Sequence, residues 1–298
     1  MINNNIKPVK KAVIPAAGYG TRFLPATKAL PKEMLPIVDT PSLQYVVAEA
    51  VEAGVTDILI VTTRGKEAIE NHFDKSFELE TILERAGKKN FLEQIQKISD
   101  MANIHYVRQK EMKGSGWAVE YAKSFVGDEP FLVLFGDDVI YTTPEQGSVS
   151  KQLVKAYEKT GTSILGVQKI LGEEIRKYGA VVPAAPTEGR FTKLKGIIEK
   201  PQGEIPSQLT SLGRFLLTAD IFEIIENTPP SPSGEIYLTD SITAQAATTG
   251  VYAYEFEGRR YDIGDKQGYL EASIEYALRR DDLKEGFSEY LKRIVKSL

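Results

Sequence analysis

The chain has 298 residues, of which 42% are hydrophobic and 26% are charged, as in ordinary globular proteins. Its 37 basic and 41 acidic residues give a formal charge of -4, a balance that argues against a nucleic-acid-binding protein. The absence of cysteine excludes disulfides, zinc-thiolate sites and thiolate catalysis, and suits the reducing cytoplasm. No apolar run approaches the ~20 residues that span a bilayer. We therefore expect an untargeted cytoplasmic protein without a membrane segment.

The first half of the chain, about residues 8–160, alternates strand and helix patterns. Strands are predicted at 11–18, 57–63, 104–109 and 131–135, and helices at 42–53, within 66–101 and at 116–125. Such alternation predicts a mostly parallel sheet with helices on both faces.

The second half, about residues 161–265, consists of short strand-like runs separated by glycine and proline. We expect it to hold the pocket of a second substrate. The proline- and serine-rich segment 228–234 predicts a surface loop, with a mobile lid as the alternative.

Two helices are predicted within residues 266–298, each with an apolar stripe. The stripes are Leu270, Ile274, Ala277 and Leu278, and Phe287, Leu291, Ile294, Val295 and Leu298. Stripes at this spacing usually belong to a core. A subunit contact is the alternative.

The strongest local signal is AAGYGTRFLPATKALPKEMLP, residues 16–36, directly after the first strand. Glycines let backbone amides approach a phosphate chain, and Arg22, Lys28 and Lys32 can neutralise its charge. A dinucleotide-binding loop would need a third glycine where Phe23 stands, and the Gly-Lys-Ser/Thr of a P-loop is absent. The segment therefore predicts a polyphosphate site, although Lys28 can equally be a solvated loop lysine.

Carboxylates follow the predicted strand 131–135. Asp137 and Asp138 stand at its carboxyl end, where open α/β sheets bind ligands, and carboxylate oxygen is a ligand that magnesium prefers. Asp138 can instead cap the following turn. His72 and His105 are expected to be surface or packing residues.

Several segments together resemble a known family. The loop reads Gly-x-Gly-Thr-Arg followed by Pro-Lys, and PATKALPKEMLPIVDTPSLQYVV, ENHFDKSFELE, GDEPFLVLFGDD, EKP and YDIGDK extend the likeness over about residues 11–291. The sequence is similar to bacterial sugar-nucleotide pyrophosphorylases of the nucleotidyltransferase A type. The resemblance implies one domain of the α/β class: a Rossmann-like, mostly parallel or mixed twisted sheet flanked by helices, with a smaller β-rich sugar-binding part.

The resemblance also implies a reaction, in which the uridylyl group of UTP is transferred to glucose 1-phosphate to give UDP-glucose and pyrophosphate. It implies Mg²⁺ as cofactor and a homodimer or homotetramer as the assembly. The alternatives are transfer from dTTP or to another hexose 1-phosphate, and a non-catalytic paralogue that binds sugar nucleotides.

Residue roles are carried over position by position. Nucleotide binding is assigned to Ala16, Ala17, Gly18, Gly20, Thr21, Glu33, Gln109 and Gly114. The catalytic set is Arg22, Lys32, Asp137 and Lys200. Sugar-phosphate binding is assigned to Gly179, Glu199, Lys200 and Gly213, and metal binding to Asp137 and Asp262.

Some of these assignments have structural alternatives. Glu33 can be a plain salt-bridging carboxylate, and Glu199 with Lys200 an exposed ion pair. Gly213 and Asp240, a weaker sugar-site candidate, can be turn or cap residues.

Three positions depart from the pattern of the family. Ser115 and Trp117 stand where leucine and histidine are usual, and Tyr237 replaces a usual glutamine. Trp117 can pack under the base pocket or fill core. These departures leave the phosphate chemistry unchanged but leave the nucleotide and sugar preference open.

Overall fold

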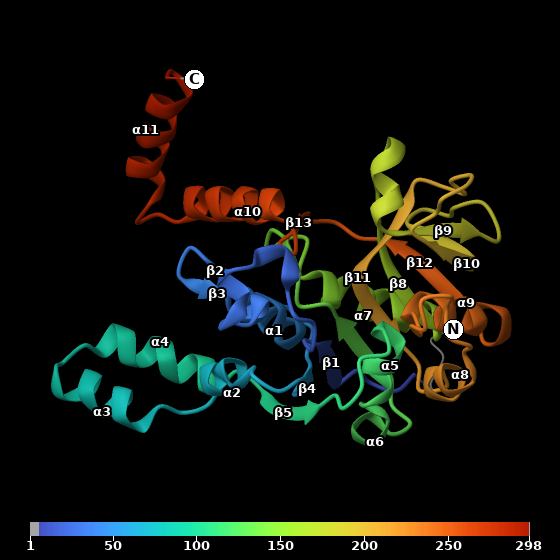
Figure 1. Cartoon of the computed structure of the whole chain (residues 1–298), viewed down its shortest axis with the longest axis horizontal. Helices are drawn as coiled ribbons and strands as arrows, with labels where there is room; N and C mark the ends of the chain where they lie inside the picture. The colour runs from blue at the N-terminus through green and yellow to red at the C-terminus, as the bar shows by residue number, and fades with distance from the viewer. Residues whose placement is uncertain (1–5, 298) are drawn as a thin grey trace.

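A computed structural model describes residues 6–297. One nine-stranded sheet forms its centre and takes strands from both halves of the chain (Figure 1). In spatial order the strands are β5 (Asn103–Arg108), β4 (Asp57–Thr62), β1 (Lys11–Pro15), β6 (Phe131–Leu134), β11 (Leu209–Leu217), β8 (Ser163–Lys169), β12 (Val251–Glu255), β10 (Phe191–Glu199) and β9 (Gly179–Pro183).

The sheet is mixed. Strands β5, β4, β1 and β6 are mutually parallel, as is the pair β8 and β12. Strand β11 is antiparallel to both of its neighbours, and β10 is antiparallel to β12 and β9. The expected parallel arrangement is thus confirmed for the first half of the chain, and the second half is the β-rich part.

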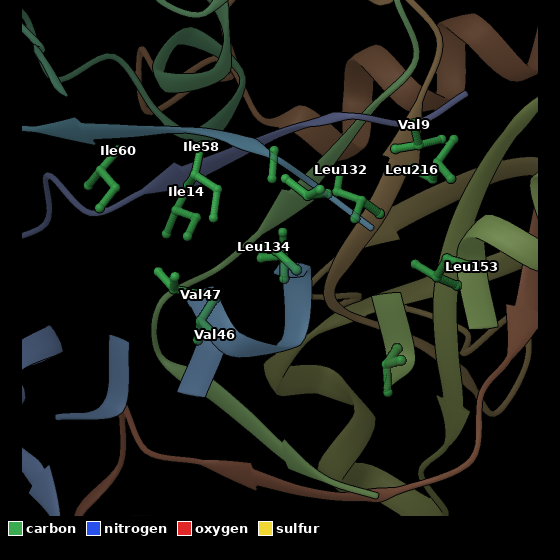
Figure 2. Packing of buried hydrophobic residues seen from close by; sticks show 14 of the residues in the cluster. Val9, Ile14, Val46, Val47, Ile58, Ile60, Leu132, Leu134, Leu153 and Leu216 are labelled. Carbon is green, nitrogen blue, oxygen red and sulfur yellow. The ribbon is translucent and has the colours of Figure 1, made fainter. Parts of the chain in front are cut away.

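Helices cover both faces of the sheet, because strands such as β1 are apolar on both sides. Ile14 lies near Val46 and Val47 of α1 (Ser42–Glu52), as Figure 2 shows, and the same cluster extends to Leu153 of α7 (Val149–Thr160). On the opposite face, Val13 belongs to a second cluster that includes residues of four further helices. These are α5 (Ser115–Glu120), α6 (Lys123–Val126), α8 (Ile221–Asn227) and α9 (Leu238–Thr248).

Two expected helices are divided in the structure. The charged region 66–101 forms α2 (Glu67–Phe73), α3 (Phe77–Arg85) and α4 (Lys89–Ser99). The helix expected at 116–125 is interrupted after Glu120, and α6 (Lys123–Val126) follows as a separate turn. Figure 1 shows α3 and α4 projecting from the body of the molecule.

Two short sheets complete the fold. Strand β7 (Asp138–Tyr141) pairs antiparallel with β13 (Arg259–Asp262), and the register places Asp138 directly opposite Asp262. Strands β2 (Pro36–Ile37) and β3 (Thr40–Pro41) form a hairpin. The β7–β13 pairing brings the carboxylates of two distant segments to one place.

The expectation that both C-terminal stripes are core is wrong. In α10 (Lys266–Arg279) Ala277 is buried, but Leu270 and Ile274 are 60% and 38% exposed. In α11 (Lys284–Val295) no residue is buried, since the helix extends away from the sheet (Figure 1). Leu298 lies outside the described residues. The alternative of a subunit contact stays a prediction.

The segment 228–234 is a largely exposed loop without helix or strand, as expected. Within residues 6–297, no helix combines the length and the apolar character needed to cross a membrane.

Candidate active site

The glycine loop, residues 16–36, follows β1 and folds back on itself. Gly20 adopts a left-handed conformation with φ of 65°, and a β-carbon there would lie 2.8 Å from Cβ of Lys32. Thr27 fixes the curl by donating its hydroxyl to the carbonyl oxygen of Gly20 at 2.7 Å. Only glycine satisfies both the backbone angle and the close approach. The loop therefore brings Lys32 beside Gly18 and Gly20, as a phosphate site requires.

The remaining loop residues form three short 3₁₀ turns. These are η1 (Thr21–Phe23), η2 (Ala26–Lys28) and η3 (Lys32–Met34). Ala16 and Ala17 are buried at its start, whereas Thr21, Arg22 and Lys28 are exposed. The side chains of Arg22 and Lys28 are thus accessible to a phosphate group that enters from solvent.

Lys32 and Asp137 meet as an ion pair. The Nζ atom of Lys32 lies 2.7 Å from Oδ2 of Asp137. Burial lowers the pKa of Lys32, but the charges of Asp137 and Glu33 outweigh burial and raise it. For Asp137, burial raises the pKa, and the charge and hydrogen bond of Lys32 more than reverse this, so that the pKa is lowered. Both groups are therefore charged at neutral pH.

Gly264 marks the point where the charged groups converge. A β-carbon on this residue would lie 3.1 Å from Nη2 of Arg22, 3.1 Å from Oδ2 of Asp137 and 3.2 Å from Oδ1 of Asp262. The amide of Gly264 also donates to Oδ1 of Asp262 at 3.1 Å. A guanidinium and two carboxylates from three distant segments thus surround a space that the absence of a side chain keeps open.

The two carboxylates at this space suit a divalent metal ion. Among the described residues no three His, Cys, Asp or Glu side chains cluster as a metal site, but Asp137 and Asp262 present two carboxylate oxygens to the same point. Magnesium keeps several waters and commonly binds through one or two carboxylates together with substrate phosphates. The donor set suits that mode of binding.

Asp138 does not cap a turn. Its Oδ1 lies 2.5 Å from Nη2 of Arg260, and the same guanidinium lies 3.4 Å from Oδ2 of Asp262. Burial raises the pKa of Asp138 to about 6, against the attraction of Arg260. Tyr178 donates its hydroxyl to Oδ2 of Asp262 at 3.0 Å. Arg260 thus lies between the carboxylates of Asp138 and Asp262 and fixes their relative positions.

The turn that carries Asp137 is held from beneath by a buried arginine. Arg214, 1% exposed, donates to the carbonyl oxygens of Phe135 at 3.1 Å and Asp138 at 2.7 Å. Its charge is balanced by Glu49, with 2.8 Å between Nη2 and Oε2. Arg214 therefore fixes the backbone on both sides of Asp137.

Glu33 forms the salt bridge that was its alternative interpretation. Its carboxylate is 1% exposed and lies 2.8 Å from Nζ of Lys66, which also donates to the carbonyl oxygen of Ala16. Burial raises the pKa of Glu33 and lowers the pKa of Lys66, against the attraction between them. This geometry anchors the glycine loop beside Lys32.

A cavity of about 140 Å³ opens next to the carboxylates. Its lining includes three of the sugar-site residues assigned from sequence, Gly179, Glu199 and Gly213, together with Asp138 and Arg260. Gly213 has φ of 64° at an irregularity in β11, and a β-carbon there would lie 2.6 Å from Oδ2 of Asp138. The glycine therefore makes room for the Asp138 carboxylate at the cavity wall.

Glu199 is the last residue of strand β10, and Lys200 follows it. Burial raises the pKa of Glu199, although Lys200 and a hydrogen bond from Thr239 lower it, and Oγ1 of Thr239 donates to Oε2 at 3.3 Å. Lys200 has φ of 46°, an uncommon angle for lysine, and its amide donates to the carbonyl oxygen of Tyr178 at 3.0 Å. Its side chain is exposed. Glu199 faces the cavity, whereas Lys200 is outside its lining.

The base-site candidates Gln109 and Gly114 lie in the segment between β5 and α5. Gln109 directly follows β5 and is 7% exposed, so it is not a surface glutamine. Gly114 has φ of 96° and lies against the backbone of Ile236. Ser115 and Tyr237, two of the departures from the family pattern, both line the cavity. Trp117 is half-buried, and the ammonium of Lys113 lies 5.3 Å from its ring centroid.

The two histidines are outside this cluster, as expected. His72 lies 3.0 Å from the side-chain oxygen of Gln44. His105 is half-exposed on β5, with Nε2 3.7 Å from Asp57. Neither has contact with the carboxylates or the glycine loop.

Four structural partners were missed by the sequence analysis: Tyr178, Arg260, Arg214 and Lys66. Arg260 had one available signal, because it precedes Asp262 by two residues and so shares its strand face. Tyr178 and Arg214 adjoin Gly179 and Gly213 in the sequence, but their contacts with Asp262 and Glu49 are long-range. The contact of Lys66 with Glu33 is long-range too.

Comparison with known proteins now decides the family. Residues 11–278 match the family model described as nucleotidyl transferase. The chain belongs to the nucleotidyl transferase family. Its relatives in this family include proteins named UTP--glucose-1-phosphate uridylyltransferase. The Staphylococcus epidermidis protein is 48% identical over 97% of this chain and 99% of its own length, and the Bacillus subtilis protein is 49% identical over 97% and 98%.

Solved structures of the family agree with the fold. A UTP-bound UGPase from Acinetobacter baumannii has a TM-score of 0.88 and 41% identity, and covers 95% of this chain and 98% of its own. A UDP-glucose pyrophosphorylase complexed with UDP-glucose has a TM-score of 0.83 and 43% identity, and covers 91% and 100%. The mixed α/β architecture is thus shared over nearly the whole chain.

Proposed function

We propose that this protein transfers the uridylyl group of UTP to glucose 1-phosphate and releases pyrophosphate. The observation that carries the proposal is the convergence of Arg22, Asp137 and Asp262 at Gly264. Asp262 also lies 3.4 Å from Arg260, which lines the 140 Å³ cavity. A triphosphate and a sugar phosphate need such a shared cationic and carboxylate centre. The relatives reported above favour this reaction over thymidylyl transfer and over a non-catalytic paralogue.

The reaction is an in-line displacement at the α-phosphorus of UTP. An oxygen of the sugar phosphate forms a bond to that phosphorus, and the bond to the β-phosphate breaks, so that pyrophosphate leaves with the bonding electrons. The second pKa of a phosphate monoester is about 6, so its oxygen is unprotonated at neutral pH. No general base is needed, which agrees with the position of both histidines outside the site.

Catalysis then depends on positioning and on charge. Arg22 offers a planar fork to two phosphate oxygens, and Lys32 offers a compact charge to the departing pyrophosphate. Glu33 and Lys66 hold the loop that carries both cations. Lys200 supplies the charge for the sugar phosphate.

The nucleotidyl transferase family generally uses a divalent metal ion, and we propose Mg²⁺, held by Asp137 and Asp262. When bound, the ion would neutralise phosphate charge and orient the triphosphate. Lys32 is ion-paired with Asp137 and so holds this carboxylate deprotonated.

The sugar half of the proposal places the hexose in the 140 Å³ cavity. The carboxylate of Glu199 can accept hydrogen bonds from sugar hydroxyls. Gly179 lines the same cavity, and a β-carbon there would lie 3.1 Å from Oε2 of Glu199. Ala16, Ala17, Gly18, Gly20, Thr21, Gln109 and Gly114 are proposed to contact the nucleotide.

We also propose that the protein is a homodimer or homotetramer located in the cytoplasm, where UTP is available. The exposed Ile294 and Val295 of α11 support a covered position for this helix in an assembly. Light scattering at several concentrations tests the assembly, and a monomer at all concentrations would contradict it.

A matrix of nucleoside triphosphates against sugar 1-phosphates tests the activity. With Mg²⁺ present, UTP and glucose 1-phosphate are expected to release pyrophosphate faster than any other pair. Faster turnover of dTTP, or of another hexose 1-phosphate, would overturn the substrate assignment, and no turnover of any pair would overturn the enzyme assignment.

A further inference from the structure

Two loops from opposite halves of the chain are joined at the wall of the cavity. We call residues 113–116 and 236–238 the loop junction. The amide of Ile236 donates to the carbonyl oxygen of Lys113 at 2.7 Å, and the amide of Gly116 donates to that of Ile236 at 2.9 Å. A β-carbon on Gly114 would lie 2.6 Å from the carbonyl oxygen of Ile236. Gly114 and Gly116 therefore allow the two backbone segments to approach each other closely enough to form hydrogen bonds, as neighbouring strands do.

One side chain takes part in the loop junction. Oγ of Ser115 accepts a hydrogen bond from the amide of Leu238 at 3.0 Å. Leu238 is the first residue of α9, and the preceding Tyr237 makes no side-chain cap. The first amides of a helix lack partners within the helix and need an external acceptor. Ser115 supplies that acceptor from the nucleotide half of the chain.

The next residue of α9 continues the connection to the sugar site. Thr239 is 8% exposed, and its hydroxyl donates to Oε2 of Glu199 at 3.3 Å. Ser115, Thr239 and Glu199 all line the cavity. The start of α9 is thus held on one side by Ser115 and itself holds Glu199 on the other.

We propose that Ser115 is a positioning residue for the hexose site, which acts on Glu199 through the first turn of α9. This inference rests on the proposed function, because it takes Glu199 as the group that binds the sugar. Ser115 therefore links the two half-sites of this chain through its hydrogen bond with Leu238.

The test compares Ser115→Ala with Ser115→Thr, which keeps the hydroxyl. Loss of the acceptor is expected to raise KM for glucose 1-phosphate about five- to tenfold, the effect of a lost helix cap. KM for UTP and kcat are expected to stay within about threefold of wild type, and Ser115→Thr is expected to restore KM. Thr239→Val interrupts the same connection at its other end and leaves the loop junction intact, so it must raise KM in the same way even if Ser115→Ala does not fold.

The double variant Ser115→Ala with Thr239→Val separates positioning from direct contact. If Ser115 acts through Thr239, the double variant resembles Thr239→Val alone. Multiplied effects would show that Ser115 reaches the sugar by another route and would overturn the inference. An equal rise of KM for UTP, or an unchanged KM for the sugar phosphate, would overturn it too. Wild-type turnover is the separate test of the proposed function. The proposed function and the role of Ser115 can therefore fail independently.

Discussion

Arg214 offers a test of how the site is built, because it is buried and contacts the site through the backbone, at the carbonyl oxygens of Phe135, Gly213 and Asp138. The perturbation is Arg214→Met, which keeps the aliphatic length and removes the charge. Its guanidinium pairs with Glu49, which also accepts from the amide and hydroxyl of Ser150 at 3.1 Å and 2.8 Å. Methionine leaves the Glu49 carboxylate buried without a counter-charge, and it removes the guanidinium donors from the carbonyl oxygens of Phe135 and Asp138.

The magnitude follows from this burial. The side chains of Arg214 and Glu49 are 1% and 8% exposed, so solvent does not compensate for the missing partner. Breaking a buried ion pair by removal of one member costs about 3–5 kcal/mol of unfolding free energy. Glu49→Gln added to Arg214→Met removes the stranded charge, and it is expected to recover about 1–2 kcal/mol of that loss.

Activity is expected to follow a different course from stability. Both the single and the double variant lack the donors that hold the backbone on either side of Asp137, so kcat is expected to fall at least tenfold in both. Urea unfolding and pyrophosphate release measure the two effects. The matched control is Arg190→Met, because Arg190 and Glu257 form a pair that is 41% and 47% exposed and is expected to contribute less than about 1 kcal/mol.

The reasoning is refuted if Arg214→Met is destabilised no more than Arg190→Met, or if the double variant regains both stability and turnover.

Three further changes probe the rest of the site and its surroundings. Gly264→Ala would place a methyl group beside Arg22 and the carboxylates of Asp137 and Asp262, and we expect the apparent Kd for Mg²⁺ to rise at least tenfold. The control is Gly203→Ala, whose β-carbon would have no atom within 4 Å and which is expected to leave this Kd unchanged. Lys200→Ala is expected to raise KM for glucose 1-phosphate more than KM for UTP, and the opposite order in steady-state kinetics would place this lysine at the nucleotide. Burial and the charge of Glu226 raise the pKa of Glu120 to about 7. The folded state therefore binds this proton more tightly than the unfolded state. As a result, the free energy of unfolding is expected to fall by about 1 kcal/mol as the pH rises from 4.5 to 7. Glu120→Gln is expected to lose this dependence in urea titrations, and an unchanged slope would contradict the assignment.

The sequence allowed the phosphate side of the site to be predicted because its signals are local. Gly18, Gly20 and Lys32 lie in one loop, where spacing and backbone freedom restrict the conformation. Asp137 follows a buried strand whose carboxyl end must lie at the ligand edge of the sheet. These features depend on a few neighbouring residues and on the position of one strand.

The supporting contacts could not be predicted in the same way. Arg260 reaches Asp138 only through the antiparallel register of β7 and β13, which joins residues 122 positions apart. Arg214 lies in a strand-like run, where an arginine alternating with apolar residues suggests a solvent-facing position. Its burial depends on Glu49, which belongs to a helix at the other end of the chain.

The prediction that the apolar stripe of the last helix belongs to the core was wrong for a related reason. The spacing of Phe287, Ile294 and Val295 indicates an apolar helix face, but amphipathicity does not say whether the covering surface belongs to the same chain. In the structure α11 has no buried residue.

A crystal structure with Mg²⁺ and UDP-glucose tests the central claim most directly. The account predicts that the diphosphate lies between Gly18, Gly20 and the carboxylates of Asp137 and Asp262, with the hexose in the cavity beside Glu199. Density for UDP-glucose away from these residues, for example in the groove between residues 6–9 and α7, would contradict it.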